Sequence, residues 1–524
     1  IICEITCAHI MLDAPLSHYL LTASQCRDID RQTIEETGID GFTLMEVAGS
    51  SAARHIAARQ IRGQDQSYDI REQDWPHGLY LCGKGNNAGD ALVVARYLLQ
   101  HTISATIVFL NGSGDLSPEG KKNLELLRKF GSRGQLAFVE SWDEFDQTEE
   151  WDFIVDGMLG TGLSSDLRGD YLKGVNWAND QDTPVLAMDI PTGLHADTGK
   201  MMGACIRAEQ TFAFGGRKLG FYLEEGPSNT GNVIYCELPF PQGFKAACNT
   251  FLLDESWVPP HHSRPGRHKY ASGVLYIVAG SEGLTGAAIL AAQSAWAEGL
   301  GAIILICPRG LLSVYEHNLP SIIKKPVGRK SDEYFMPRHL SSLLSIVGEK
   351  KGAVLFGPGL GRREDTVTFT TQFLSRNPRH TVIDADALWC LAQSEQWDKP
   401  DDVEWILTPH PGELSRFADY SIEDGAQRLR FVRTFASNKQ ITILSKGMPG
   451  IIGTSTGKCY LTNYNTRYFA RAGSGDILAG KTGAYLTHGQ TPAVSCAAGL
   501  LQGKRKLDHY LKTEQDLPEP SDFI

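Results

Sequence analysis

The chain has 524 residues, a length that one hydrophobic core rarely organises, so we expect two domains of roughly 250 residues each. Hydrophobic residues make up 42% of the sequence and charged residues 21%, as in ordinary globular proteins. The formal net charge of -11 argues against a nucleic-acid-binding protein, because there is no surplus of basic side chains to neutralise phosphates. No segment approaches the ~20 apolar residues that a membrane span requires, so no membrane partner is expected.

The N-terminal segment and the cysteines indicate where the protein is located. Residues 1–10 lack the basic segment of a signal peptide, and we interpret them as an extension outside the folded domains. Cys3 and Cys7 have no histidine partners at metal-binding spacing, and no Cys-x-x-Cys pair occurs. Cys82 and Cys307 lie in apolar runs, which indicates buried, reduced thiols and favours a cytoplasmic protein.

The first half begins with helical patterns at 22–34 and 44–56 and then alternates short apolar runs with helical periods. We expect strands at 79–82, 105–110, 153–155, 185–188, 211–214 and 233–236, with helices at 90–100 and 118–130. Short buried strands that alternate with helices predict a parallel, doubly wound α/β sheet.

The pattern breaks at 257–266, where three prolines and a glycine suit neither a helix nor a strand. We therefore predict a domain at 11–243, a linker at 244–266 and a second domain at 267–510. In the second domain we expect strands at 274–278, 302–306, 353–356, 381–383, 405–407 and 441–444, and helices at 286–298, 411–418 and 475–485. This half is also α/β, and the absence of a repeat between the halves indicates two different folds.

A glycine-rich segment, Gly83 to Asp90, follows the first apolar strand and leads into a helix. Glycines let a ligand approach the backbone closely, and a helix start offers free N–H groups to a phosphate. The spacing fits neither the dinucleotide fingerprint nor a Walker loop. A tight turn capped by Asn87 and Asp90 is the alternative, but two adjacent asparagines and an aspartate favour a ligand site.

Two aspartates mark the ends of further strands in this half. Asp156 precedes Gly160-Thr161-Gly162, and Asp189 precedes Ile190-Pro191-Thr192-Gly193. An aspartate at a strand end often only caps a helix or forms a turn. Because ligands collect where the carboxyl ends of parallel strands meet, three such loops at one edge predict a binding site.

These loops occur in one order together with three further segments: 22–30, Leu44 to Gly49, and Lys218 to Gly220. The set resembles the NAD(P)H-hydrate epimerase domain over residues 20–240. Members of that family interconvert the R and S forms of hydrated NADH and NADPH and bind a potassium ion. The resemblance implies a Rossmann-like fold for the first domain.

The resemblance also assigns residues. It implies that the hydrated nucleotide contacts Asn86, Asn87, Ala88, Gly89, Asp90, Gly160, Thr161, Gly162, Leu163, Ser164, Ser165, Asp166 and Asp189. It implies Asn87, Asp156 and Thr192 as oxygen ligands of K⁺. Asp156 is our candidate for acid–base catalysis, since these loops hold no rival cysteine or histidine. Ala88 and Ala91 replace two glycines of the family, and a positive φ at position 88 would cost about 1 kcal/mol.

The most specific local signal is Gly473-Ser474-Gly475-Asp476, a glycine-rich turn that opens into an apolar helix. Unpaired N–H groups at such a helix start stabilise an anion, and a phosphoryl group in transfer is a developing anion. Asp476 in the first turn can accept a proton from an attacking hydroxyl. A plain helix N-terminus with a favourable aspartate is the alternative, although a simple cap rarely needs two glycines.

Other strand ends in this half carry supporting loops. The bend at 356–361 is poor in side chains, and prolines on both sides hold His410 in front of a helix. The loop 445–450 offers Lys446 and a flexible backbone to a nucleotide phosphate or base. Asp384 and Asp386 could hold a water-coordinated metal.

With Gly280 and Thr285-Gly286-Ala287, these loops resemble NAD(P)H-hydrate dehydratase, a member of the ribokinase-like superfamily, over residues 262–490. The Thr-Pro-His-Pro-Gly-Glu element at 408–413 distinguishes it from sugar and vitamin kinases. Members phosphorylate the hydroxyl of the S hydrate and then eliminate phosphate, which regenerates NAD(P)H. Fused two-domain members use ADP and give AMP and phosphate, but the residues themselves do not separate ADP from ATP.

By this resemblance Asp476 is the catalytic base, and the hydrate contacts Ala287, Gly359, His410 and Asp476. The adenine nucleotide would contact Lys446, Gly447, Met448, Pro449, Gly450 and Gly475, with Mg²⁺ in the same domain. Two other functions stay open at this point: a small-molecule kinase with an accessory nucleotide-binding domain, and a nucleotide sensor without catalysis. We further expect a homo-oligomer whose partners are hydrated NAD(P)H and adenine nucleotide.

Overall fold

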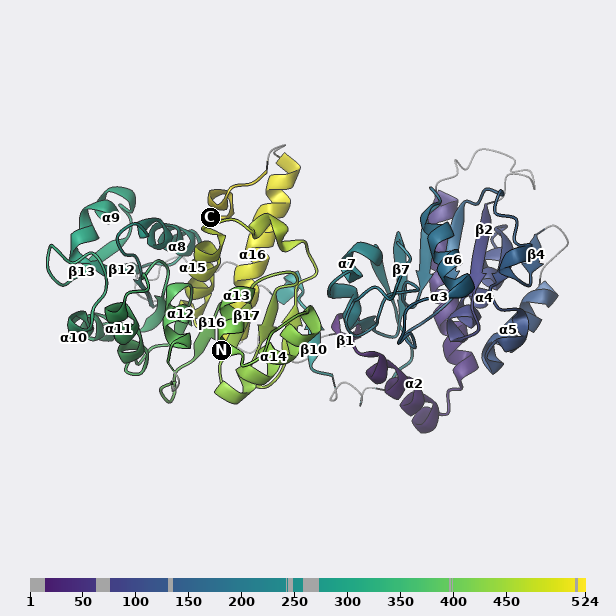
Figure 1. Ribbon diagram of the computed structural model, residues 1–524, viewed down its shortest axis with the longest axis horizontal. Coiled ribbons are helices and arrows are strands. Elements are labelled where there is room, and N and C mark those ends of the chain that lie inside the picture. Colours follow the sequence, from purple (N-terminus) through teal and green to yellow (C-terminus); the bar gives the residue numbers. More distant parts are fainter. Residues whose placement is uncertain are drawn as a thin grey trace. The chain divides into compact units, whose positions relative to one another are not determined.

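The computed structural model describes residues 15–62, 76–130, 135–241, 243, 248–257, 273–394, 397, 399–513 and 517–524 (Figure 1). The chain forms two compact units whose boundary along the sequence lies between Thr250 and Phe251. Each unit contains its own largely parallel sheet flanked by helices, which confirms the predicted α/β class. The extension at 1–10, with Cys3 and Cys7, lies outside the described residues.

The first unit is built on a seven-stranded parallel sheet of order β4-β3-β2-β5-β6-β7-β9. Its elements are β1 (Leu20–Leu21), α2 (Ala23–Thr37), α3 (Gly41–Arg62), β2 (His77–Cys82), α4 (Asn86–Leu99), β3 (Ser104–Phe109), α5 (Pro118–Phe130), β4 (Leu136–Val139), β5 (Phe153–Gly157), α6 (Gly169–Asn179), β6 (Val185–Met188), β7 (Gln210–Phe214), β8 (Arg217–Lys218), α7 (Gly226–Asn229) and β9 (Asn232–Cys236). The chain runs outward from β2 to β4 and returns to β5. The reversal between β2 and β5 is where such sheets bind ligands.

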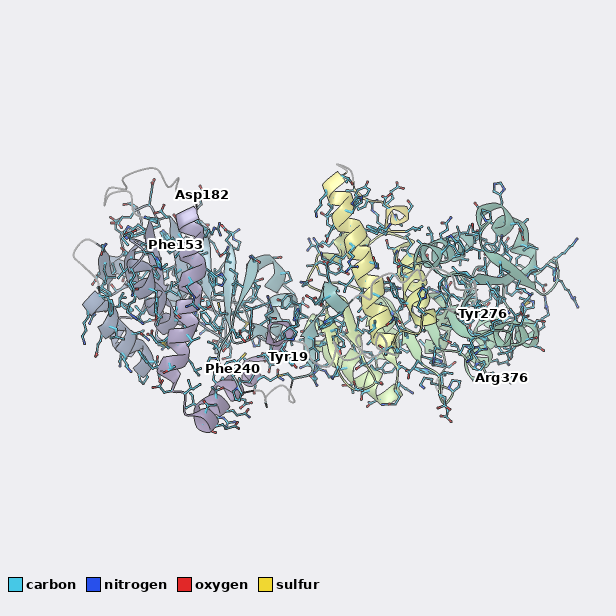
Figure 2. All side chains as sticks on the ribbon, turned by 180° about the vertical axis from the view of Figure 1, so that it is seen from behind. Tyr19, Phe153, Asp182, Phe240, Tyr276 and Arg376 are labelled. Atoms are coloured by element: carbon cyan, nitrogen blue, oxygen red, sulfur yellow. The ribbon has the colours of Figure 1, made fainter. Side chains whose placement is uncertain are left out.

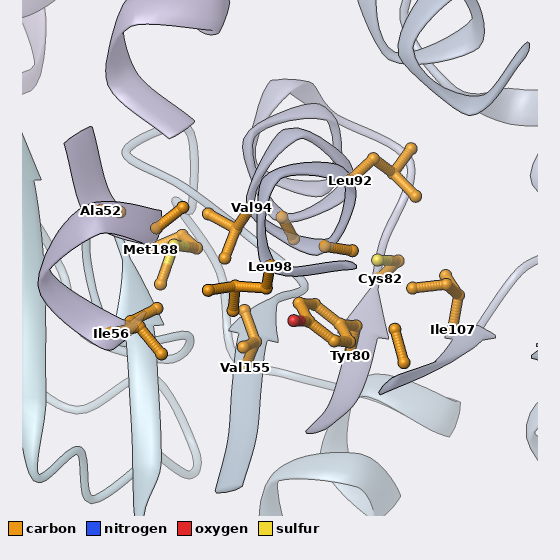
Figure 3. Close-up of a cluster of buried hydrophobic side chains, with 14 of the residues drawn as sticks. Ala52, Ile56, Tyr80, Cys82, Leu92, Val94, Leu98, Ile107, Val155 and Met188 are labelled. Atoms are coloured by element: carbon orange, nitrogen blue, oxygen red, sulfur yellow. The ribbon is translucent and has the colours of Figure 1, made fainter. Parts of the chain in front are cut away.

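Strand β2 shows how this sheet is buried on both faces. Leu79 and Leu81 pack on the side of α6, whereas Tyr80 and Cys82 pack on the side of α3 and α4. The alternation follows from the pleat, which turns successive side chains to opposite faces. Figure 3 shows the second side, where Ile56 of α3 and Leu98 of α4 lie over the strands. Because helices cover both faces, every side chain of such a strand is buried and must be apolar. This is why the strands could be predicted.

The second unit has a ten-stranded sheet of order β10-β19-β18-β17-β16-β15-β14-β11-β12-β13. Its strands are β10 (Thr250–Leu252), β11 (Val274–Val278), β12 (Ile303–Pro308), β13 (Ile323–Val327), β14 (Gly352–Phe356), β15 (Thr381–Ile383), β16 (Trp405–Leu407), β17 (Thr442–Ser445), β18 (Ile451–Gly453) and β19 (Cys459–Leu461). Strands β11 to β17 pair in parallel, and β18 and β19 add an antiparallel edge. The order reverses between β11 and β14, which brings the loops after these two strands together.

Helices cover both faces of this sheet: α8 (Thr285–Ala297), α9 (Leu312–Asn318), α10 (Leu340–Gly348), α11 (Glu364–Leu374), α12 (Asp386–Ala392), α13 (Pro411–Leu414), α14 (Gly425–Lys439), α15 (Ser474–Thr487) and α16 (Pro492–Thr513). Helix α15 packs closely on α8, because a Cβ at Gly480 would lie 2.3 Å from the carbonyl oxygen of Ala291. A buried ion pair between Lys481 Nζ and Glu298 Oε1, 2.7 Å apart, joins α15 to the end of α8. Phe153 of β5 and Tyr276 of β11 mark the interiors of the two units in Figure 2.

The segment predicted as a linker, 244–266, contains a strand of the second sheet. Strand β10 lies next to β19, and the N–H of Leu253 donates to the carbonyl oxygen of Leu461 at 2.7 Å. Residues 258–266 lie outside the described residues. Within the described part of the chain, nine cysteines are free thiols, and all except Cys26 are buried, as expected of core residues. The same part has no helix whose length and hydropathy would suit a membrane span.

Candidate functional sites

A cavity of about 660 Å³ opens at the reversal between β2 and β5 of the first unit. Ten of the predicted nucleotide contacts line it: Asn86, Asn87, Asp90, Gly160, Thr161, Gly162, Leu163, Ser164, Ser165 and Asp189. Ala88 and Gly89 are buried in α4 and Asp166 is exposed outside the cavity lining, so these three are not on the wall. The structure thus brings most of the predicted nucleotide contacts of this unit into one place.

The segment Asn86 to Asp90 is the first turn of α4 and not a loop. Gly85 is the N-cap residue and contributes no side-chain hydrogen bond, so the helix start is open toward the cavity. Ala88 does not have a positive φ. The alanine therefore carries no backbone strain, and the departure from the family's glycine pattern does not disturb the geometry of this turn.

Three residues that the sequence assigns to potassium lie together at the cavity, which Asn87 also lines. Asp156 Oδ2 accepts from the N–H of Thr192 at 2.7 Å, and Asp156 Oδ1 accepts from Thr192 Oγ1 at 2.7 Å. Asn87 Nδ2 donates to the carbonyl oxygen of Leu159 at 3.1 Å, and Thr192 Oγ1 accepts from the N–H of Leu159. Asn87 Oδ1 is buried and has no hydrogen-bond partner. An unsatisfied buried oxygen beside carboxylate, hydroxyl and carbonyl oxygens fits a hard cation such as K⁺.

Asp156, predicted as the acid–base residue, occupies a buried position. Its side chain is 0% exposed and does not line the cavity. Burial raises the pKa of Asp156 to about 6, although hydrogen bonds from Thr192 and Met158 oppose the rise. Because three donors hold its oxygens and it is fully buried, Asp156 has the surroundings of a positioning group, and its acid–base role stays a prediction from the sequence.

Two other residues, Asp189 and Lys218, form an ion pair on the cavity wall. Lys218 is 1% exposed, and its Nζ also donates to the carbonyl oxygens of Gly216 and Phe214 at 3.1 and 3.3 Å. Burial alone would lower the pKa of Lys218, but the neighbouring carboxylate of Asp189 raises it. The sequence assigns no role to Lys218 beyond its place in the segment 218–220. Its role depends on the return of β8 beside β1, which the sequence pattern did not show.

In the second unit, Asp384, Lys446 and Asp476 form the centre of the predicted site. Lys446 Nζ and Thr408 Oγ1 both donate to Asp384 Oδ1 at 2.6 Å, which anchors Asp384 at the end of β15. Asp476 lies in the first turn of α15, after Gly473 with its left-handed φ of 94°. Burial, followed by the charge of Asp384, raises the pKa of Asp476 to about 7, while Lys446 lowers it. A base with a pKa near neutrality suits proton abstraction from a hydroxyl.

The glycine bend after β14 meets the start of α8. Gly359 has a φ of 62°, and a Cβ there would lie 2.5 Å from the carbonyl oxygen of Leu284 and 3.2 Å from Ala287 Cβ. Ser281 Oγ donates to the carbonyl oxygen of Gly359 at 2.9 Å. Gly359 and Ala287, predicted separately as substrate contacts, are therefore neighbours at the reversal between β11 and β14.

His410 both caps a helix and presents one edge of its ring to a ligand. Its Nδ1 accepts from the N–H groups of Gly412 and Glu413 at 3.1 and 3.4 Å, and Glu413 Oε2 accepts from the N–H of His410 at 3.0 Å. The histidine is thus the N-cap of α13. Because Nδ1 is an acceptor, the neutral ring carries its proton on Nε2. The side chain is 59% exposed, so this edge of the ring remains accessible to a ligand.

A second cavity, of about 490 Å³, lies beside the start of α15. Its lining includes His410 and the predicted nucleotide contacts Lys446, Gly447, Met448, Gly450 and Gly475, but not Pro449. The rest of the wall includes apolar and aromatic side chains, Tyr464, Phe469, Leu478, Leu500 and Phe523 among them, and the basic side chains of Arg467, Arg471 and Lys481.

Two features prepare this cavity for a phosphate. Arg428, which is buried, donates to the carbonyl oxygens of Lys446 and Pro449 at 3.0 and 2.6 Å and so holds the loop 446–450 in place. Ser474 Oγ is buried without a partner at the cavity edge. A hydroxyl without a partner beside an open helix start is a free donor for an anion.

The predicted pair Asp384 and Asp386 does not form a metal site by itself. Asp386 accepts from the N–H of Gly361 at 2.9 Å and from Arg362 Nε at 2.7 Å. Among the residues that the structure describes, no group of three His, Cys, Asp or Glu side chains could hold a metal ion. A divalent cation would therefore need ligands from a bound nucleotide.

Comparisons with known proteins agree with this two-unit description. The model of the YjeF-related protein N-terminus matches residues 41–220, and the model of NAD(P)H-hydrate dehydratase matches residues 275–507. The bifunctional NAD(P)H-hydrate repair enzyme of Salinibacter ruber is 32% identical over 94% of this chain and 92% of its own length. The enzyme of the same name from Moorella thermoacetica is 33% identical over 92% and 90%, respectively.

Among solved structures, the ADP/ATP-dependent NAD(P)H-hydrate dehydratase from Bacillus subtilis, co-crystallised with ATP and Mg²⁺, is 21% identical. That likeness has a TM-score of 0.43 and covers 50% of this chain and 90% of the other. The two largely parallel sheets flanked by helices agree with the Rossmann-like and ribokinase-like folds predicted for the first and second units. With both family models matched in order and relatives similar over nine-tenths of its length, the chain belongs to the family of bifunctional NAD(P)H-hydrate repair enzymes.

Proposed function

We propose that the first unit interconverts the R and S forms of hydrated NADH and NADPH, and that the second unit dehydrates the S form with ADP, which yields AMP and phosphate. The observation that carries this proposal is the position of Asp476, a carboxyl with a pKa of about 7 in the first turn of α15, next to the nucleotide cavity. A base and an anion-binding helix start at one point are what phosphorylation of a hydroxyl requires.

In the second unit Asp476 takes the proton from the substrate hydroxyl, and the oxygen attacks the terminal phosphorus of ADP. The bond between that phosphorus and the bridging oxygen breaks, and AMP leaves with the electron pair. The open N–H groups of α15 and the ammonium of Lys446 stabilise the negative charge that develops. The bond between the ring carbon and the ester oxygen then breaks, and phosphate leaves with the electron pair. The adjacent ring carbon gives a proton to solvent, and its C–H electron pair restores the double bond of NAD(P)H.

The remaining site residues fall into two groups, those that contact the hydrate and those that contact the nucleotide. Ala287, Gly359 and His410 contact the hydrate, and the loop 446–450 with Gly475 holds the adenine nucleotide. A Mg²⁺ ion bound with the nucleotide would reduce the charge on its phosphates. The free hydroxyl of Ser474 is a further donor to the phosphates.

In the first unit the hydrated nucleotide occupies the cavity at the start of α4. Asn87, Asp156 and Thr192 would hold K⁺ beside this cavity, together with the carbonyl oxygen of Leu159. The ion would neutralise Asp156 and fix the turn that follows β5. We assign to Asp156 this positioning role and place the acid–base groups on the cavity wall, where Asp189 forms its ion pair with Lys218.

One assay tests both activities. The whole protein is incubated with mixed R and S NADH hydrate, ADP and Mg²⁺, and the return of reduced-nicotinamide absorbance is followed with spontaneous epimerisation subtracted. Complete recovery at a rate above the spontaneous one is expected. Recovery of the S fraction alone would show that the first unit lacks epimerase activity. A stable phosphorylated product without recovery would instead support a small-molecule kinase, and no reaction with retained binding would support a sensor.

The choice of co-substrate is tested in the same assay. We expect ADP to support dehydration more efficiently than ATP, measured as kcat/KM for each nucleotide. Cytoplasmic location and homo-oligomeric assembly stay predictions from the sequence; fractionation and the solution molar mass would test them.

A further inference from the structure

Helix α2 contributes one face to the cavity of the first unit. Cys26, Arg27, Asp30 and Ile34 line the cavity, and their spacing places them on one side of a helix. Asp30 is thus the carboxylate that α2 presents to the cavity, two turns into the helix.

The start of α2 is held in position by three contacts. Strand β1 pairs in parallel with β8, so that Leu21 lies opposite Lys218 in the ladder. Thr22 and Gln25 form a capping box, in which the N–H of Thr22 donates to Gln25 Oε1 at 2.9 Å. The N–H of Ala23 donates to Asp197 Oδ1 at 2.6 Å. These contacts fix the helix relative to the strand that carries Lys218.

Asp30 faces other ionisable groups across the cavity. Asp189 and Lys218 act on it from the loop after β6 and from β8, Asp90 lies on α4, and Cys26 lies on its own helix. Desolvation by the protein around it, followed by the charge of Asp189, raises the pKa of Asp30 to about 6. Two neighbouring carboxyls do not both ionise readily, and Lys218 is bonded to Asp189. Burial, followed by the charge of Asp189, also raises the pKa of Asp90, so both carboxyls favour the protonated form. Asp30 is exposed whereas Asp90 is only 9% exposed, so Asp30 is the protonated carboxyl that a ligand in the cavity can contact.

We propose that Asp30 is the general acid of the epimerisation and that Asp189 is the base. The proposal rests on the epimerase function proposed above. Asp30 donates its proton to the hydroxyl on C6 of the hydrate, the C6–O bond breaks, and the lone pair of N1 forms a C=N double bond as water leaves. Water returns to the opposite face of C6 and gives a proton to Asp189. Proton exchange with solvent then restores both carboxyls to their starting states.

The test replaces Asp30 by asparagine in the full chain and uses Asp28→Asn as the matched control. Asp28 lies on the same helix, and its side chain is 55% exposed in a surface pair with Arg31. R/S exchange is measured by chromatography of the two forms, with the spontaneous rate subtracted. We expect Asp30→Asn to lower kcat for exchange by about 100-fold or more with KM changed less than about threefold. Asp28→Asn should exchange like the wild type, and dehydration of the S form should be unchanged in both.

The pH profile separates an acid from a structural residue. Because Asp30 must be protonated, wild-type exchange should decline as pH rises through about 6. This decline should be absent from the residual exchange of Asp30→Asn, and Asp30→Glu should restore part of the rate together with the decline. Wild-type kcat in Asp30→Asn, a changed KM with an intact kcat, or a decline that persists in the variant would overturn the assignment. If the wild type itself does not exceed the spontaneous rate, the epimerase function fails first, and the role of Asp30 fails with it.

Discussion

Replacing Asp476 by asparagine should make the second unit more stable at neutral pH although it abolishes dehydration. Burial and the nearby Asp384 raise the pKa of Asp476 from 3.8 to about 7. Between these two values the folded protein holds a proton that the unfolded chain has already lost. The contribution of this group to the free energy of unfolding is therefore greatest below pH 4 and falls as pH rises through 7. The full difference is about 4 kcal/mol, and contact of the side chain with water reduces it.

Asparagine keeps the shape of the side chain without its charge, so the free energy of unfolding of the variant does not fall as the pH rises. At pH 8 we expect Asp476→Asn to gain roughly 2 kcal/mol, or about 4–8 °C in melting temperature for a unit of this size. The thermal transition to follow is the one that adenine nucleotide shifts upward in the wild type. Asp419→Asn, an exposed change in the same unit, is the control and should leave the transition unmoved.

The gain should shrink as the pH is lowered from 8 to 5, since the wild-type carboxyl then holds its proton. A variant no more stable than the wild type at pH 8 would contradict the reasoning. So would a gain of equal size at both pH values, because it would come from packing and not from charge. The same protein should retain R/S exchange, which shows that the first unit is intact.

Three further changes test the remaining parts of the two sites. Thr192→Val removes the hydroxyl that bonds the proposed potassium ligands, and the K⁺ concentration for half-maximal R/S exchange should rise about 10–100-fold in a KCl titration. Gly359→Ala adds a Cβ 2.5 Å from a carbonyl oxygen at a φ of 62°, and urea unfolding should show a loss of about 1–3 kcal/mol together with weaker binding of the S hydrate. Lys446→Met removes the cation that lowers the pKa of Asp476, so the pH–rate profile of dehydration, which rises as this base ionises, should move to higher pH by about one unit or more.

Each of these changes has an outcome that would count against it. Unaltered K⁺ dependence in the valine variant would remove Thr192 from the ion site, and a fully stable alanine variant would mean that the bend at Gly359 can relax. A pH profile that stays in place without Lys446 would show that this cation does not act on the base.

The strands were predictable because the sheets are covered on both faces. Val185–Met188, Val274–Val278 and Trp405–Leu407 appear in the structure with the predicted bounds, since a doubly buried parallel strand must be apolar along its whole length. Strand β13 (Ile323–Val327) escaped prediction because it is an edge strand with two lysines and a proline, a composition that also fits a loop. The start of α4 was placed four residues late, because its first turn reads as a loop of asparagines and glycine.

The motifs by themselves determined which loops carry chemistry. Gly473-Ser474-Gly475-Asp476 predicted an anion site with an adjacent base, because a glycine turn before a helix leaves N–H groups free whatever surrounds it. The order of the motifs predicted the family, because the epimerase motifs and then the dehydratase motifs follow one another along the chain.

Only the tertiary structure decided which titratable side chains line the cavity of the first unit and which are buried away from it. The cavity opens at the reversal between β2 and β5, yet Asp156, near the end of β5, is fully buried and does not line it, whereas Asp189 does. Lys218 and Asp30 join Asp189 only because β8 returns beside β1 and thereby fixes α2. A pKa depends on burial and on charges that are distant in sequence, so the acid and the base could be assigned only after the chain had folded.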